Sequence, residues 1–233
     1  MGSNGIKVLI GCEESQAVCI EFRKLGFDAY SCDIQECSGG HPEWHFNEDI
    51  FEVIKKKEWD CMIAFPPCTH LAVAGARHFK TKILDGRQQE GIDFFMSMVN
   101  APIKHIAIEN PIGIMSTKYK KPTQVIHPYY FGDDQSKATC LWLKNLPSLY
   151  HNESVNLFDD IVTHNKEVQW HEWVDKKTGK KRRYSKFLAD AWLKNTDKKT
   201  VSLLRSKTFP GIAKAMATQW GEYLIQKIKH NGK

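Results

Sequence analysis

Short apolar runs alternate with amphipathic stretches over the first 145 residues. The apolar runs predict buried strands at residues 6–10, 28–32, 59–65 and 104–108. The stretches between them predict helices at residues 15–25, 47–56 and 88–99, because their apolar positions recur at helical spacing. This alternation of strand and helix is typical of a doubly wound, mostly parallel α/β sheet.

Weaker patterns complete the chain. Strands are expected at residues 123–127 and 138–143, and a C-terminal helix at residues 212–228. A hairpin turn is expected at residues 175–180, with Thr178-Gly179 at its tip. Ser15 is the expected N-cap of the first helix, and Gly26 the residue that ends it. Residues 69–87 read as a long loop, which in a compact domain is more often functional than accidental.

The composition fits one large α/β domain or a domain with a modest insertion. The chain has 233 residues, of which 42% are hydrophobic, and no apolar run reaches the length of a membrane span. No signal-peptide pattern stands at the N-terminus, so we expect a soluble, cytoplasmic protein. The formal charge of +6 is compatible with a polyanionic partner.

The 7 cysteines include no Cys-x-x-Cys pair, and a cytosolic setting disfavours disulfides. Cys32, Cys37, His41 and His45 could be read as a zinc site. Their spacing fits no standard zinc pattern, and scattered loop residues are the preferred interpretation. We therefore assign no metal site from the sequence.

Three polar side chains stand where predicted strands end. Pro66 and Pro67 terminate the run 59–65, because proline cannot continue a strand ladder, and Cys68 follows in a loop. Asp33 and Glu109 close two other strands. The carboxyl ends of parallel strands meet at one sheet edge, so we expect these three side chains to converge there. A buried structural thiol and a capping or surface acid are the alternative interpretations of Cys68 and Glu109.

A cysteine and a glutamate without an evident histidine base argue against a protease-type dyad. The pair suits attack on an electron-poor ring such as cytosine. A thiolate added at C6 makes C5 nucleophilic, and a glutamate that protonates or hydrogen-bonds N3 lowers the cost of the addition. The residue types therefore favour chemistry at C5 of cytosine.

Two stretches resemble motifs of the DNA cytosine-5 methyltransferases. Residues 65–68 (Phe-Pro-Pro-Cys) resemble the Pro-Cys nucleophile motif, and residues 108–111 (Ile-Glu-Asn-Pro) resemble the Glu-Asn-Val motif, with proline in place of valine. The resemblance covers most of residues 6–145 and 205–225. It implies a Rossmann-like methyltransferase sheet, catalytic roles for Cys68 and Glu109, and S-adenosyl-L-methionine as cofactor.

The same resemblance implies a cofactor site. Residues 8–15 stand in the place of the motif that holds the methionine part, although Gly-Cys-Glu-Glu-Ser has fewer glycines than the family's loop. The family's ribose-binding acid corresponds to Asp33, and its Asp-Ile at the adenine corresponds to Asp49 and Ile50. The implied cofactor-binding residues are Gly11, Cys12, Glu13, Ser15, Asp33, Ile34, Asp49, Ile50 and Pro66.

Residues 150–204 differ from the rest of the chain in composition. Polar residues dominate there, and aromatic residues alternate with lysines and arginines. We assign residues 1–149 and 205–233 to a catalytic domain, and residues 150–204 to a small basic insertion that acts as a reduced target-recognition region. Its cations are expected to hold phosphates and its tryptophans to stack bases; a solvated hairpin over a small subcore is the alternative. The implied substrate or DNA contacts are Lys137, where the family has an arginine, Lys180, Lys181, Arg182, Arg183 and, in the long loop, Arg77.

The sequence therefore predicts an S-adenosyl-L-methionine-dependent DNA (cytosine-5-)-methyltransferase of phage or restriction-modification type, with DNA as partner and no membrane association. Two alternatives stay open. One is C5 modification of a free pyrimidine nucleotide such as dCMP, which needs no large reader domain. The other is a non-catalytic nucleic-acid-binding module of the same fold. The recognition sequence, a partner subunit that supplies specificity, the oligomeric state and the base that removes the C5 proton stay open as well.

Overall fold

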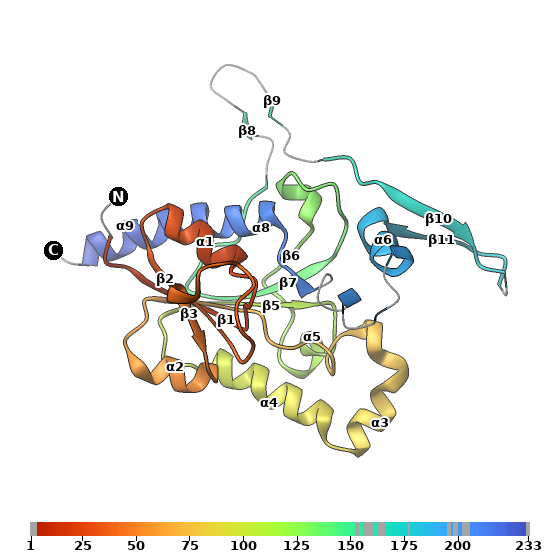
Figure 1. Ribbon diagram of the computed structural model, residues 1–233, viewed down its shortest axis with the longest axis horizontal. Helices are drawn as coiled ribbons and strands as arrows, with labels where there is room; N and C mark the ends of the chain where they lie inside the picture. Colours follow the sequence, from red (N-terminus) through yellow and green to blue (C-terminus); the bar gives the residue numbers. More distant parts are fainter. Residues whose placement is uncertain are drawn as a thin grey trace. The chain divides into compact units, whose positions relative to one another are not determined.

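The computed structural model describes residues 4–151, 154–155, 161–162, 166–176, 178–194, 197, 200–201 and 206–231 (Figure 1). The chain divides into two compact units. The first comprises Met1–Ile126, Ala138–Leu149 and Ala213–Lys233, and the second comprises His127–Lys137 and Tyr150–Ile212. The second unit thus takes in residues 127–137, which the sequence analysis assigned to the catalytic domain. The functional roles of the two units stay predictions.

A seven-stranded sheet forms the centre of the first unit, in the order β3-β2-β1-β4-β5-β7-β6. The five strands from β3 to β5 are parallel, and β7 runs antiparallel to both β5 and β6. This arrangement confirms the expected doubly wound, mostly parallel, Rossmann-like α/β fold. The strands are β1 (Lys7–Gly11), β2 (Asp28–Asp33), β3 (His45–Asn47), β4 (Cys61–Ala64), β5 (His105–Pro111), β6 (Gln124–Ile126) and β7 (Thr139–Lys144).

Helices cover both faces of this sheet (Figure 1). On one face lie α1 and the C-terminal helix, and on the other lie α2 and α4. The C-terminal helix confirms the expected element, with one π-helical turn inserted between its α-helical parts. The helices of the first unit, including one that begins in the second, are α1 (Ala17–Lys24), η1 (Pro42–Trp44), α2 (Ile50–Lys56), η2 (Val73–His78), α3 (Phe79–Leu84), α4 (Arg87–Val99), α5 (Met115–Lys118), α8 (Pro210–Ala215), η4 (Met216–Trp220) and α9 (Gly221–Asn231).

The apolar pattern is explained by burial on both faces. All four residues of β4 are buried, as a central parallel strand requires. On the α4 face, Phe95 meets Trp142 edge-on, with ring centroids 5.2 Å apart. On the α1 face, Phe22 and Trp220 are fully buried. The Trp220 indole donates to the Pro147 carbonyl at 2.9 Å, which ties the C-terminal helix to the loop after β7.

Two local expectations were wrong. The predicted loop 69–87 contains the helices η2 and α3. Their apolar residues do not recur at helical spacing, so the sequence gives no sign of these helices. The N-cap of α1 is Gln16 rather than Ser15, and Gln16 adopts a left-handed φ of 58°. The α1 amides are instead satisfied by the Glu13 carboxylate, which accepts from Val18 N at 2.7 Å and from Cys19 N at 3.2 Å.

The second unit contains a two-stranded ribbon with a helix near its base (Figure 1). Its elements are η3 (Pro128–Phe131), β8 (Ser154–Val155), β9 (Ile161–Val162), β10 (Trp170–Val174), β11 (Lys181–Ser185) and α6 (Lys186–Lys194). The expected hairpin is confirmed, and Gly179 takes a φ of +66° near its tip. In the described part of the chain, no helix is long and apolar enough to cross a membrane.

Candidate functional site

The carboxyl ends of β2, β1, β4 and β5 lie side by side. Register pairs Gly11 with Cys32 and with Ala64, and pairs Ala64 with Ile108. The strand order reverses between β1 and β4, and such a reversal opens the crevice in which doubly wound folds bind ligands. The polar residues that follow these strands therefore share one edge of the sheet.

A side-chain hydrogen bond joins the Cys68 loop to β5. Asn110 Nδ2 donates to the Pro66 carbonyl at 2.8 Å, and both residues are buried. Glu109 precedes Asn110 in β5, and Cys68 lies two residues beyond Pro66. Of the four buried side-chain polar atoms without a hydrogen-bond partner in the described residues, one is Asn110 Oδ1. An unpaired buried acceptor at this edge is a polar group that a ligand can satisfy.

Glu109 also faces the antiparallel neighbour β7. Its register partner is Leu141, and Cys140 lies beside that position. Burial raises the pKa of the Cys140 thiol to about 11, and the nearby Glu109 carboxylate contributes to this rise. Glu109 itself is half-buried.

Backbone bonds close the Cys68 loop into a tight turn. The amides of Leu71 and Ala72 both donate to the Cys68 carbonyl, at 3.0 and 2.9 Å. The Ile114 amide donates to the Leu71 carbonyl at 2.9 Å, which fixes the loop to the segment after β5. A Cβ atom at Gly113 would lie 2.3 Å from the same carbonyl oxygen, so this close approach requires glycine.

Two buried polar side chains hold the next part of this loop. The Lys82 ammonium of α3 donates to the Thr69 carbonyl, and Gln88 Nε2 of α4 donates to the His70 carbonyl at 3.5 Å. Lys82 is 8% exposed, which is rare for a lysine. Burial lowers the pKa of His70, and the positive charge of Lys82 lowers it further.

A second polar network shapes the loop between β1 and α1. The buried Gln16 donates from Nε2 to the His41 carbonyl at 2.8 Å and accepts at Oε1 from His41 N at 3.0 Å. It also donates to the Ser31 hydroxyl at 3.2 Å. A Cβ atom at Gly39 would lie 2.6 Å from Gln16 Cβ and from the Ser15 carbonyl oxygen, so the two loops pack tightly. Ser15 itself is half-buried in this loop.

Two carboxylates lie close to Cys12. Burial raises the pKa of the Cys12 thiol, and the negative charges of Asp33 and Asp49 raise it further. Asp33 Oδ1 accepts from Gln35 N at 2.9 Å. Asp49 is the N-cap of α2 and accepts from the following helix at 2.7 Å. The end of β2 and the start of α2 thus form an acidic group of residues beside the β1 loop.

Several predicted cofactor residues serve the fold directly. Ile50 is buried, and a Cβ atom at Gly11 would lie 2.0 Å from Ile50 Cδ1, so Gly11 makes room for that side chain. Glu13 is 4% exposed and caps α1. Ile34 differs, since it is 80% exposed directly after Asp33 at the sheet edge. An exposed isoleucine at this position offers an apolar surface to a ligand.

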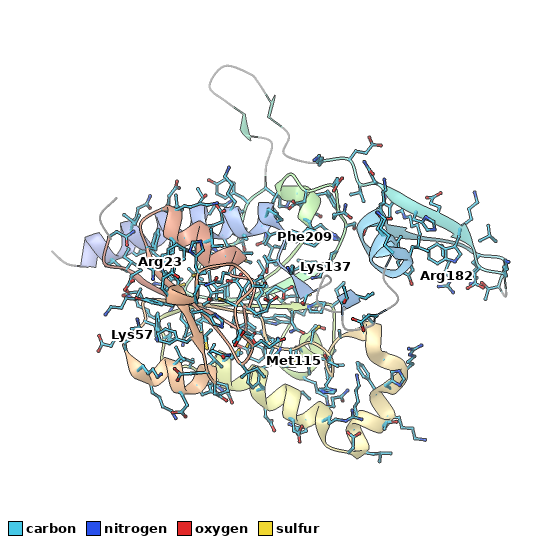
Figure 2. All side chains as sticks on the ribbon, in the orientation of Figure 1. Arg23, Lys57, Met115, Lys137, Arg182 and Phe209 are labelled. Atoms are coloured by element: carbon cyan, nitrogen blue, oxygen red, sulfur yellow. The ribbon has the colours of Figure 1, made fainter. Side chains whose placement is uncertain are left out.

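The predicted substrate residues fall in both units. Arg77 is exposed in η2 and donates from Nε to His78 Nε2 at 2.9 Å. Lys137 belongs to the second unit, where its ammonium lies 5.9 Å from the centroid of the Phe209 ring (Figure 2). The cations Lys180, Lys181, Arg182 and Arg183 are exposed at the tip and on strand β11 of the ribbon.

Sequence reasoning missed three residues that organise the edge. Asn110 was read as a neighbour of Glu109, and neither Gln16 nor Lys82 was singled out. A buried amide or lysine gives no sign in the sequence of the carbonyl that it will bind. All seven cysteines lie within the described residues and none forms a disulfide. Nor does any cluster of three or more His, Cys, Asp or Glu side chains in that part of the chain have the arrangement to hold a metal ion.

Comparison with known proteins adds little to this geometry. No protein-family model matches the chain. No curated protein matches it either. Among solved structures, one match is described as a candidate DNA modification methyltransferase encoded within a prophage (E. coli), with 16% identity and a TM-score of 0.42. The match covers 60% of this chain but 46% of that one, just under half its length, and likeness at this level carries no argument about activity.

We predict that Glu13 makes stability fall as pH rises. Burial raises the pKa of Glu13 from 4.5 to about 8, so between these values the folded state holds a proton that the unfolded state has lost. The free energy of unfolding should fall by up to about 1.4 kcal/mol per pH unit in that window. Urea unfolding from pH 5 to pH 8 measures this slope. Glu13→Gln should flatten it, whereas the exposed control Glu36→Gln should not; equal slopes in all three proteins would refute the assignment.

We further predict that Lys82→Met loosens the Cys68 loop. Loss of the charged donor to the Thr69 carbonyl should cost about 1.5–3 kcal/mol locally. Hydrogen exchange followed by mass spectrometry should then show at least about tenfold faster exchange in residues 68–73. Lys80→Met, an exposed position on the same helix, is the matched control. Identical exchange in the two variants would exclude this role for Lys82.

Proposed function

We propose that the protein transfers a methyl group from S-adenosyl-L-methionine to C5 of cytosine in DNA. One observation carries the proposal: the Asn110–Pro66 hydrogen bond ties the loop of Cys68 to the strand of Glu109 at the ligand-binding edge of the sheet. The resemblance of residues 65–68 and 108–111 to two motifs of the DNA cytosine-5 methyltransferases supports the same chemistry.

The proposed reaction uses one nucleophile and one acid. The Cys68 thiolate adds to C6 of cytosine, while Glu109 shares its proton with N3, so that the electron pair of the 5,6 double bond becomes available at C5. Once C5 carries the methyl group, a base takes the C5 proton, the N3 proton returns to Glu109, and expulsion of the Cys68 thiolate restores the 5,6 double bond. We assign no residue to that base.

The residues beside β1 and β2 fit the proposed cofactor in chemical type. Carboxylates suit ribose hydroxyls and a cationic sulfonium, and Asp33 and Asp49 provide them next to Cys12. The exposed Ile34 offers an apolar surface for the adenine. Gly11, Glu13 and Ile50 would act indirectly, by fixing the loop and helices around the site. When bound, S-adenosyl-L-methionine supplies an electrophilic methyl group.

DNA as substrate requires cations and an exposed target base. A base inside a duplex is out of reach of a thiol in a sheet-edge loop, so it must be flipped out of the stack. The proposed contacts to that nucleotide are the loop that contains Cys68 and Arg77 of η2, the helix that follows this loop. Lys137 and the basic run at residues 180–183 are the proposed contacts to phosphates.

We predict that Cys68→Ala abolishes methyl transfer while cofactor binding persists. Without the thiol no C6 adduct forms, and activity should fall at least about 10⁴-fold, to the detection limit. The measurement is transfer of labelled methyl groups from S-adenosyl-L-methionine to unmethylated duplex DNA and, in parallel, to dCMP. Calorimetry of cofactor binding to both proteins is the control. Cys61→Ala, a buried cysteine in β4, is the matched thiol variant and should retain transfer if it folds.

Each outcome of this assay separates the alternatives. Label in DNA that is lost with Cys68→Ala supports the proposal. Label in dCMP alone would replace it with nucleotide modification. If the protein binds the cofactor but labels neither substrate, the proposed reaction is contradicted. If it neither binds the cofactor nor labels a substrate, a non-catalytic nucleic-acid-binding module is favoured.

We also predict that the basic run contributes to the salt dependence of DNA binding. Neutralising Lys180 and Lys181 together should weaken binding and make the slope of log K against log salt shallower by up to about 2. The same charge change made elsewhere, as Lys55→Gln with Lys227→Gln, should leave the slope within about 0.5 of the original. Equal slopes in the two double variants would remove the run from the interface.

A further inference from the structure

The ribbon of β10 and β11 exposes large aromatic side chains on both faces. Cross-strand register pairs His171 with Tyr184 on one face and Trp170 with Ser185 on the other. Tyr184 is 52% exposed and Trp170 39% exposed. A two-stranded ribbon has no core of its own in which to bury such rings, so their exposure needs a reason beyond packing.

Three rings form a strip along one face, which we call the ring face (His171, Trp173 and Tyr184). The centroids of His171 and Trp173 are 6.2 Å apart and those of Trp173 and Tyr184 are 4.9 Å apart, with planes inclined by 33° and 35°. The buried pair Phe95 and Trp142 instead meets at 85°, edge against face. The rings of the ring face are therefore inclined at shallow angles to one another, unlike the edge-to-face packing of the buried pair.

Cations lie on both faces of the ribbon, with Arg182 on the ring face and Lys181 and Arg183 on the opposite face. Arg182, which Figure 2 labels on the ribbon, is in register with Trp173. Its guanidinium pairs with Asp175, with Nε 3.1 Å from Oδ2. On the opposite face, the Arg183 guanidinium lies 4.3 Å from the centroid of the Trp170 ring. Lys181 is exposed as well, across from Val174. Aromatic surfaces interleaved with cations are complementary to a chain that carries both bases and phosphates.

The geometry decides between possible partners. An apolar protein surface would gain nothing from Arg182 beside the rings or from Lys181 and Arg183 on the opposite face of the ribbon. Readout of an intact duplex needs side chains that hydrogen-bond base edges, and the ring face instead offers flat π surfaces, which need bases that are not already stacked in a duplex. We propose that the ring face binds unpaired bases of a single-stranded nucleic acid by stacking. This rests on the proposed function and adds to it a surface of the ribbon that takes unpaired bases.

The test compares two forms of DNA. Fluorescence anisotropy would measure binding of the full chain to a labelled 12-nucleotide oligothymidine and to a 12-base-pair duplex, where the lengths are about the site size of such proteins. Trp173→Ala and Tyr184→Ala should each weaken single-strand binding about 5- to 100-fold, with the salt slope unchanged. Duplex affinity should change less than about threefold. Trp173→Phe keeps a ring and should recover most of the loss.

A matched control and a background variant make the result decisive. Tyr150→Ala removes an exposed aromatic ring outside the ribbon, and single-strand affinity should stay within about twofold of the original. All variants are made with Cys68→Ala, so binding is measured without methyl transfer. Normal single-strand affinity in both alanine variants, or equal losses for single strand and duplex, would overturn the stacking proposal. Neither result would bear on the Cys68 chemistry, which the methyl-transfer assay tests separately.

An arm with oligouridine distinguishes the two sources of unpaired bases. Stacking tolerates either sugar, so DNA and RNA strands should lose affinity in parallel when Trp173 is replaced. If replacement of Trp173 lowers the affinity for oligouridine alone, the proposal is restricted to RNA. If it lowers the affinity for oligothymidine alone, the proposal is restricted to DNA.

Discussion

The arrangement at the sheet edge depends on a constraint that the two prolines impose. Pro66 and Pro67 carry no N–H group, so their backbone can form hydrogen bonds only through its carbonyl oxygens. The Pro66 carbonyl accepts from Asn110 at 2.8 Å, and the Thr69 carbonyl accepts from Lys82. Cys68 therefore stands between two carbonyls that are held by side chains from other elements, and its position does not rest on a strand ladder.

The β1 side of the edge is built by the same device. The Gln16 amide bonds both the carbonyl and the amide of His41, and Glu13 accepts from the first amides of α1. Buried polar side chains thus replace the glycine-rich turn that dinucleotide-binding folds use at this place. A loop held by side chains can keep a shape that its backbone alone would not favour, as the left-handed φ of 58° at Cys12 and Gln16 indicates.

The sequence predicts the strands of this structure much better than the side-chain contacts that fix its loops. The parallel strands were predictable because β1 and β4 are short apolar runs buried on both faces. The placement of Asp33, Cys68 and Glu109 along one edge of the sheet followed from the direction of those strands, whereas the convergence of their side chains stays a prediction. The fixing bonds were not predictable, since Asn110 and Pro66 are 44 residues apart and their contact leaves no periodic pattern. The helices η2 and α3 were missed for a related reason: their order is set by contacts such as that of Lys82 rather than by an amphipathic repeat.

Within the first unit the charges divide along the sheet edge. Asp33 and Asp49 lie on the β1–β2 side, close enough to raise the pKa of Cys32 to about 12 together with burial, which is the larger effect. After Cys68 in the chain, η2 and α3 carry the exposed cations Arg77 and Lys80. Carboxylates attract a sulfonium cation and exposed cations attract a phosphate chain, so both groups of charges fit the ligands of the proposed function. A neutral ligand would have no need of these charges, so they favour the proposed pairing of a cationic cofactor with a polyanionic substrate over a neutral ligand at this edge.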